Sequence, residues 1–77
     1  MEKDLVEYIV KSIVDDPSAV SIRVVDGEAS SILELSVGSG DIGKVIGKGG
    51  RVARAIRTVL HAAAAKGGKR AILEILD

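Results

Sequence analysis

The sequence contains no cysteine, no phenylalanine and no tryptophan. Without cysteine there is no disulfide, no thiol nucleophile and no zinc–thiolate centre. The core must be aliphatic, and we expect the only aromatic residue, Tyr8, to pack at the margin of that core. The lack of aromatic side chains also excludes a base-stacking platform of the kind that OB-fold and RRM domains use.

Catalytic groups are missing as well. His61 stands on a polar helix face with no carboxylate or thiol near it in the sequence, so we expect no catalytic residue, no metal site and no cofactor. The apolar runs are far too short to span a bilayer, and the N-terminal segment lacks the features of a secretory signal. We therefore expect a soluble, cytoplasmic protein that is not an enzyme.

The chain length of 77 residues corresponds to one small domain, residues 1–77. A core of this size supplies on the order of 3–5 kcal/mol of net stability. The net charge is zero, but residues 1–40 carry eight acidic against three basic side chains, whereas residues 41–70 carry eight basic side chains and one aspartate. The basic segment could bind an anion locally, or it could be the solvated face of a helix.

Hydrophobic periodicity predicts six elements in the order α-β-β-α-α-β. The expected helices cover residues 2–15, a short segment between Ser39 and Ile46, and residues 51–66; the expected strands cover residues 20–25, 31–37 and 70–76. Pro17 ends the first helix, Asp26 and Gly27 mark a turn, and Ser39 or Asp41 caps the short helix. A helical segment between the last two strands permits parallel pairing. We therefore predict an α+β fold with a three-stranded mixed sheet, the second strand in the centre and three helices on one face.

Residues 37–51 read VGSGDIGKVIGKGGR and contain three glycine patterns associated with phosphate binding. The dinucleotide fingerprint G-x-G-x-x-G begins at Gly38, but the acidic residue that should follow on the next strand is missing, as is a second mononucleotide half. A partial Walker A pattern, G-x-x-x-x-G-K, runs from Gly38 to Lys44, but Val45 stands at the position where Ser or Thr should bind magnesium. Neither of these two patterns is favoured.

The third pattern is I-G-x-x-G, residues 46–50, between the short helix and the long one. A Cβ at any of its glycines would obstruct a phosphate that approaches the backbone. The loop leads into the N-terminus of helix 51–66, where free N–H groups favour an anion. Lys48 adds a charge at the tip of the loop and Arg51 adds a donor fork.

The element order and the segment VIGKGGRVARAIR together resemble a type II KH domain, and within that group the KhpA family of small stand-alone bacterial KH proteins. The resemblance covers essentially the whole chain and is most specific in residues 43–57. One departure is Ala53, which stands where many KH domains place Ile, and Ile56 is expected to take over its packing role. The resemblance implies that about four nucleotides of single-stranded RNA lie in a narrow cleft. The implied RNA-binding residues are Lys44, Ile46, Gly47, Lys48, Gly49, Gly50, Arg51 and Arg54.

The resemblance also implies where the bases would lie. They would rest on Ile42, Ile46 and either Val52 or Ala53, with their edges meeting backbone groups of the edge strand near residues 71–73. The variable loop, residues 66–69, is very short and would cover little RNA. The resemblance further implies that the protein pairs with a KhpB-like KH protein. It also implies a link to the control of cell wall and cell length and a role as an RNA chaperone.

One cleft without stacking aromatics should bind weakly, and two linked clefts would gain through effective concentration. We therefore expect a homodimer, a heterodimer or both, with the alanine-rich end of the long helix or the loop region as contact surfaces. The alternative hypothesis is a protein-interaction module whose loop docks a partner and whose RNA binding is secondary.

Overall fold

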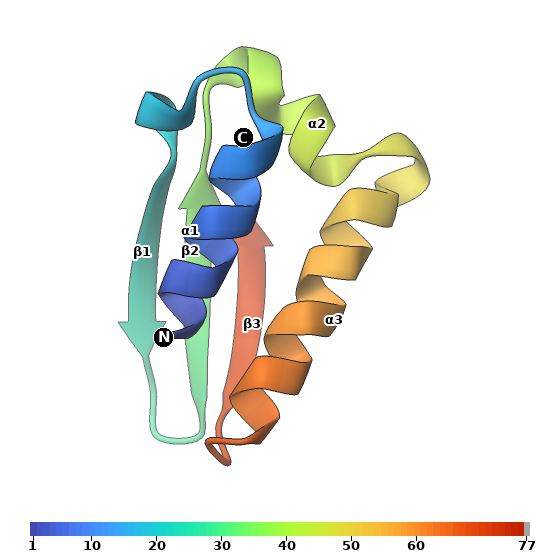
Figure 1. The fold of residues 1–77 in the computed structure, drawn as a ribbon. Coiled ribbons are helices and arrows are strands. Elements are labelled where there is room, and N and C mark those ends of the chain that lie inside the picture. Colours follow the sequence, from blue (N-terminus) through green and yellow to red (C-terminus); the bar gives the residue numbers. More distant parts are fainter. Residues whose placement is uncertain (77) are drawn as a thin grey trace.

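The structure is a computed structural model and describes residues 1–76; Asp77, which the predicted domain includes, lies outside the described residues. Its helices and strands follow the predicted α-β-β-α-α-β order (Figure 1). They are α1 (Glu2–Ile13), β1 (Ser21–Asp26), β2 (Ser30–Ser36), α2 (Ile42–Ile46), α3 (Arg51–Ala65) and β3 (Arg70–Ile75). Short 3₁₀ turns cover Pro17–Ala19 and Ser39–Asp41, and Lys48–Gly50 forms a turn with left-handed backbone angles at its two glycines.

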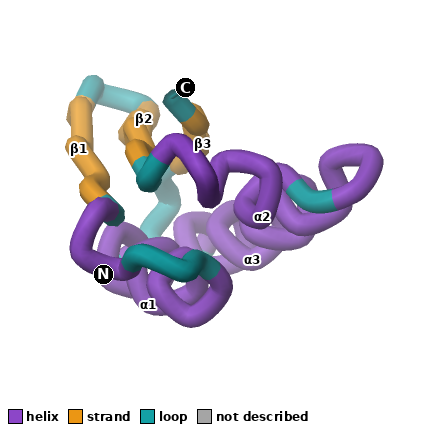
Figure 2. Tube along the Cα trace, turned by 90° about the horizontal axis from the view of Figure 1, so that it is seen from above, coloured by secondary structure: helices purple, strands orange, loops and turns teal. Residues whose placement is uncertain are grey.

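The sheet has the strand order β1-β2-β3, so the second strand is central as predicted. Strand β1 runs antiparallel to β2, with Ile22 opposite Leu35, and β3 runs parallel to β2, with Leu73 opposite Leu33. Viewed from above, the strands form one layer and the helices lie together on one side of it (Figure 2). The predicted mixed sheet with one helical face is therefore confirmed, and β3 is an edge strand beside α3.

The core lies between the sheet and the helices and is entirely aliphatic, as the composition requires. Its buried side chains are Val6, Val10, Val14, Leu33, Leu35, Val45, Ile56, Leu60, Ala64, Ala71 and Leu73. Val45 is fully buried and ties the short helix α2 into this core. Ile56 and Ala53 are both buried, at 3% and 4% exposure, and the expectation that Ile56 takes over the packing role of position 53 stays a prediction.

Two details of α1 differ from the sequence-based expectation. The helix ends at Ile13 rather than at residue 15, because Val14 adopts an extended conformation with φ −80° and ψ 158° that directs its side chain into the core. Tyr8 is 75% exposed, so the expectation that it packs at the core margin was wrong. It lies two residues from both Val6 and Val10, and a two-residue step of about 200° places it on the opposite face of the helix.

Candidate nucleic-acid interface

The loop between α2 and α3 projects from one corner of the molecule (Figure 1). Helix α2 ends here because Gly47, with φ 74° and ψ 171°, leaves the helical region. Gly49 and Gly50 follow with φ values of 64° and 78°, and this left-handed pair turns the chain into α3. Lys48 and Gly49 are exposed, so the tip of the loop is accessible.

The glycines of this loop are required for two different reasons. A Cβ on Gly47 would lie 2.8 Å from Val52 Cβ and 2.9 Å from the Val52 backbone nitrogen, so the packing of the protein itself excludes a side chain there. A Cβ on Gly49 or Gly50 would meet no atom within 4 Å, and only their positive φ favours glycine. At Gly47 the contact with Val52 therefore gives a reason for glycine within the protein itself, in addition to the predicted room for a phosphate.

A groove with a volume of about 520 Å³ lies beside the loop, between α2, the first half of α3 and the end of β3. It is lined by Ile42, Ile46, Gly50, Ala53, Arg54, Arg57, Glu74 and Ile75. Aliphatic side chains form its floor, and Ile46 is 39% exposed there although it is strongly apolar. Arg54 Nη2 donates to the carbonyl oxygen of Gly49 at 3.3 Å, and Arg57 Nη2 lies 3.5 Å from the carbonyl oxygen of Leu73. The guanidinium groups are thus held at the wall of the groove.

The groove brings together part of the predicted site. Ile46, Gly50 and Arg54 line it, as do Ile42 and Ala53. Residues 71–73, whose backbone groups were expected to meet base edges, are not among its lining residues, and that contact stays a prediction.

Sequence reasoning missed Arg57, Glu74 and Ile75 as groove residues. Arg57 could have been found, because it follows Arg54 by three residues and so lies on the same helix face. The two strand residues could not, because their place beside α3 depends on the register of the parallel β2–β3 pair.

A second groove of about 330 Å³ lies on the other side of the loop, between α1 and α3. It is lined by Ile9, Ile13, Arg51, Val52, Ala55, Ile56 and Val59, and Arg51 is its only charged lining residue within the described chain. Val52 therefore belongs to this apolar groove, and of the two alternatives expected to support a base only Ala53 lines the first groove. Arg51, predicted as an RNA ligand, lies on this outer side of the loop.

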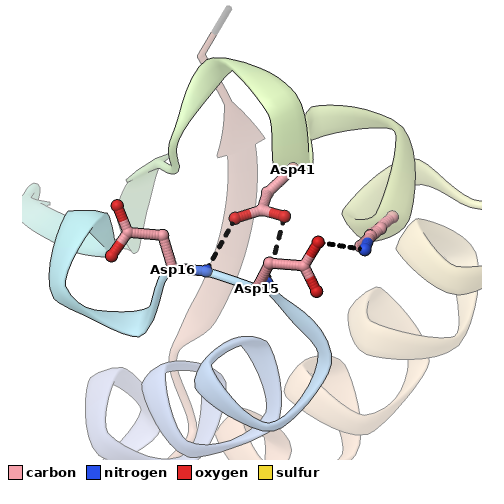
Figure 3. Close-up of polar contacts among 4 residues, drawn as sticks. Asp15, Asp16 and Asp41 are labelled. Carbon is pink, nitrogen blue, oxygen red and sulfur yellow. Dashed lines mark hydrogen bonds and ion pairs between the residues drawn. The ribbon is translucent and has the colours of Figure 1, made fainter.

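Asp41 connects α2 to the segment after α1 (Figure 3). Its carboxylate is 4% exposed and accepts the backbone N–H groups of Asp15 at 3.1 Å and of Asp16 at 3.0 Å. These hydrogen bonds lower the pKa of Asp41 below its ordinary value. Of the two expected cap residues, Ser39 and Asp41, it is Asp41 that occupies the N-cap position of α2, but its side chain makes no cap hydrogen bond.

Lys44 strengthens the same connection. Its Nζ lies 2.6 Å from Asp15 Oδ2, and this hydrogen bond raises the pKa of Lys44. The structure thus places this predicted RNA ligand in an ion pair with the neighbouring segment and outside the groove lining. A helix as short as α2 is unstable in isolation, so these contacts and the buried Val45 hold it, and hence the loop that follows, in position.

Two negative findings apply to the part of the chain that the structure describes. Within residues 1–76 there is no group of three or more His, Cys, Asp or Glu side chains that could hold a metal ion. In the same range, none of the helices has the length and apolar character needed to cross a membrane.

The fold and this site define a class of protein. An α-β-β-α-α-β chain with an I-G-x-x-G loop between two helices, beside a narrow aliphatic groove, has the architecture of a type II KH domain. The family model described as KhpA/KhpB, KH domain, matches residues 3–75. The chain belongs to this KhpA/KhpB KH-domain family.

Individual relatives agree with this assignment. The chain is 57% identical over 76 residues to the RNA-binding protein KhpA of Borreliella burgdorferi. The aligned region covers 99% of this chain and 93% of the relative. It is 48% identical over 75 residues to the RNA-binding protein KhpA of Aquifex aeolicus, covering 97% of this chain and 95% of the relative. Family membership also confirms the expectation that the chain is not an enzyme.

A solved structure shares the fold. A crystal structure of an Era variant from Aquifex aeolicus, bound to GDP and aluminium fluoride, superimposes with a TM-score of 0.68 at 14% sequence identity. The match covers 96% of this chain and 29% of the Era chain. At this identity the likeness concerns the fold alone.

Proposed function

We propose that this protein binds single-stranded RNA in the groove beside the loop Gly47–Gly50, and that it acts in the cytoplasm as an RNA chaperone or post-transcriptional regulator. The observation that carries the proposal is the combination of an aliphatic groove floor with an exposed glycine loop and arginines at the groove wall. The names of the relatives, which are RNA-binding proteins, support it.

In this proposal the loop holds the sugar–phosphate backbone. Nothing lies within 4 Å of the positions where Gly49 and Gly50 would carry a Cβ, so a phosphate can approach the main chain there. Lys48 is exposed at the tip, and Gly50 stands at the N-cap of α3 without a side chain that would occupy the first N–H groups of the helix. Such free N–H groups and the helix dipole favour an anion.

The bases would rest on the aliphatic floor formed by Ile42, Ile46 and Ala53. A cleft of this kind holds about four nucleotides. Arg54 and Arg57 supply hydrogen-bond donors along the wall. In this proposal Arg51 contributes through its charge beside the loop, and Lys44 through its hold on α2.

A double variant, Lys48→Asp with Gly49→Asp, tests the proposal. Asp tolerates the left-handed conformation of Gly49 better than most residues do, and a Cβ at Gly49 would meet no atom within 4 Å. We expect the fold to be retained, as checked by circular dichroism, and binding of a short fluorescent RNA to be lost in fluorescence anisotropy. A matched control with Lys3→Asp and Ser18→Asp changes the charge equally at exposed positions elsewhere. Unchanged RNA binding in the loop variant would overturn the proposal.

We also propose that the chain pairs, either with a second copy or with a KhpB-like KH protein. One groove without aromatic side chains binds weakly, and pairing adds a second groove at high effective concentration. The family model, which covers both KhpA and KhpB, supports a related partner.

The apolar groove beside Arg51 favours the alternative function, a protein-interaction module. Its occupant in this proposal is a second copy of the chain, because the lining is apolar apart from Arg51, and the acidic first turn of α1 in a second copy offers carboxylates to that arginine. Val59 is 43% exposed in this groove. Val59→Glu should therefore abolish a dimer in sizing chromatography with light scattering. If it abolishes the dimer and leaves RNA binding unchanged, pairing and RNA binding use separate surfaces; an unchanged dimer would reject this surface.

A further inference from the structure

A separate pocket of about 300 Å³ lies at the other end of α3, where the chain enters β3. It is lined by His61, Ala64, Ala65, Lys69, Arg70 and Ala71. Ala64 and Ala71 are buried, so small side chains form the floor and cations stand at the rim. The alanine run of α3, which the RNA groove does not involve, is what leaves this space open.

The pocket continues the line of the RNA groove along the same helix. The groove is lined by Ala53, Arg54 and Arg57 of α3, and the pocket by His61, Ala64 and Ala65. Steps of three and four residues keep all of them on one helix face. His61 lies four positions after Arg57, a distance of about 6 Å along the helix axis. Both sites also use the same edge strand, the groove at its end and the pocket at its beginning.

The chemistry of the pocket suits one nucleotide. His61 is exposed and offers a planar ring on which a base can stack. The guanidinium of Arg70 is exposed and can donate to a phosphate. Lys69 is partly engaged, since its Nζ lies 3.2 Å from Asp26 Oδ1, so Arg70 is the stronger candidate for the phosphate contact.

We propose that this pocket is a subsite for one further nucleotide of the single-stranded RNA, beyond the four that the groove next to the loop accommodates. The inference rests on the proposed RNA binding and extends it. It assigns a role to His61, Ala65 and Arg70, and it makes the affinity depend on whether the RNA is long enough to reach the far end of α3.

The test fills the pocket without disturbing the core. Ala65 lines the pocket and is exposed, so the larger side chain of Ala65→Leu would occupy the pocket. Ala62 is exposed on the same helix but does not line the pocket, so Ala62→Leu is the matched control. Fluorescence anisotropy is measured with oligouridine and oligoadenine of four and of eight nucleotides. We expect Ala65→Leu to weaken the eight-nucleotide RNAs at least fivefold relative to Ala62→Leu, the lower range for loss of one stacked base, and to leave the four-nucleotide RNAs unchanged.

A charge variant checks the phosphate contact independently. Arg70→Gln should weaken the eight-nucleotide RNAs more than Lys66→Gln, which removes an equal charge from a residue outside the lining. Equal affinities within each pair of variants would overturn the subsite while leaving the proposed function intact. If the unaltered chain binds neither length of RNA, the proposed function fails, and the subsite fails with it.

Discussion

Replacing Gly47 with alanine tests whether the fold itself requires the first glycine of the loop. Its φ of 74° and ψ of 171° lie in a region that is essentially restricted to glycine, and an L-residue there costs on the order of 1–3 kcal/mol. The new Cβ would lie 2.8 Å from Val52 Cβ, and such overpacking adds about 1–3 kcal/mol. The sum of about 2–6 kcal/mol is comparable with the whole net stability of a small core, on the order of 3–5 kcal/mol.

The matched control is Gly49→Ala in the same loop. Gly49 has φ 64° and ψ 18°, and its Cβ would meet no atom within 4 Å. The cost is therefore limited to the left-handed conformation, about 1–2 kcal/mol. Urea denaturation followed by far-UV circular dichroism gives the free energy of unfolding of each variant. We expect Gly47→Ala to be largely unfolded, or to lose clearly more stability than Gly49→Ala.

Equal losses of stability in the two variants would refute the reasoning, because they would show that Val52 does not crowd position 47. The comparison also decides how RNA-binding variants are designed. We expect a substitution at Gly47 to unfold the loop region, whereas one at Gly49 changes the loop surface at a smaller cost in stability.

Three further predictions follow from the contacts around the loop and the core. The hydrogen bonds from the backbone of Asp15 and Asp16 lower the pKa of Asp41 in the folded state. The ionised carboxylate therefore stabilises the fold at pH values above the ordinary aspartate pKa of about 3.9. This contribution is lost as the pH falls through the lower pKa of the folded state. Asp41→Asn should therefore show a smaller drop in melting temperature between about pH 6 and pH 3 than the unaltered chain; an equal drop would contradict this. Lys48→Ala should weaken RNA binding more than Lys44→Ala, since Lys44 is paired with Asp15, and fluorescence anisotropy with one RNA compares the two variants; equal weakening would contradict this prediction. Leu60 is fully buried, so Leu60→Ala should cost about 2–5 kcal/mol in urea denaturation, and a loss below about 1 kcal/mol would place Leu60 outside the tightly packed core.

The order and type of the elements could be predicted because they depend on local signals. Pro17 and the Asp26–Gly27 turn divide the first half of the chain, and alternating or helical periodicity identifies each segment. The end of α1 and the place of Tyr8 were missed because tertiary packing decides them. Val14 is extended and its side chain lies in the core, and Tyr8 lies on the face of α1 opposite to the core, where it is 75% exposed.

The candidate site divides in the same way. The loop and Arg54 are found from a contiguous motif, whereas the partners of Asp41 lie 25 and 26 residues earlier in the chain and no local pattern joins them. Lys44 was interpreted by its charge alone, and its pairing with Asp15 needs the same tertiary contact. The requirement for glycine at position 47 became clear only from the place of Val52.

The parallel pairing of β2 with β3 determines when during folding the groove can exist. The β1–β2 hairpin needs only residues 27–29 as its connection and can close within about 1–10 µs. Strand β3 pairs with β2 across residues 37–69, and the loop-closure entropy of such a long-range pairing makes it slow to form. Because the groove lies between α3 and the end of β3, a nascent chain that has completed only its hairpin has not yet formed the surface on which the proposed RNA binding depends.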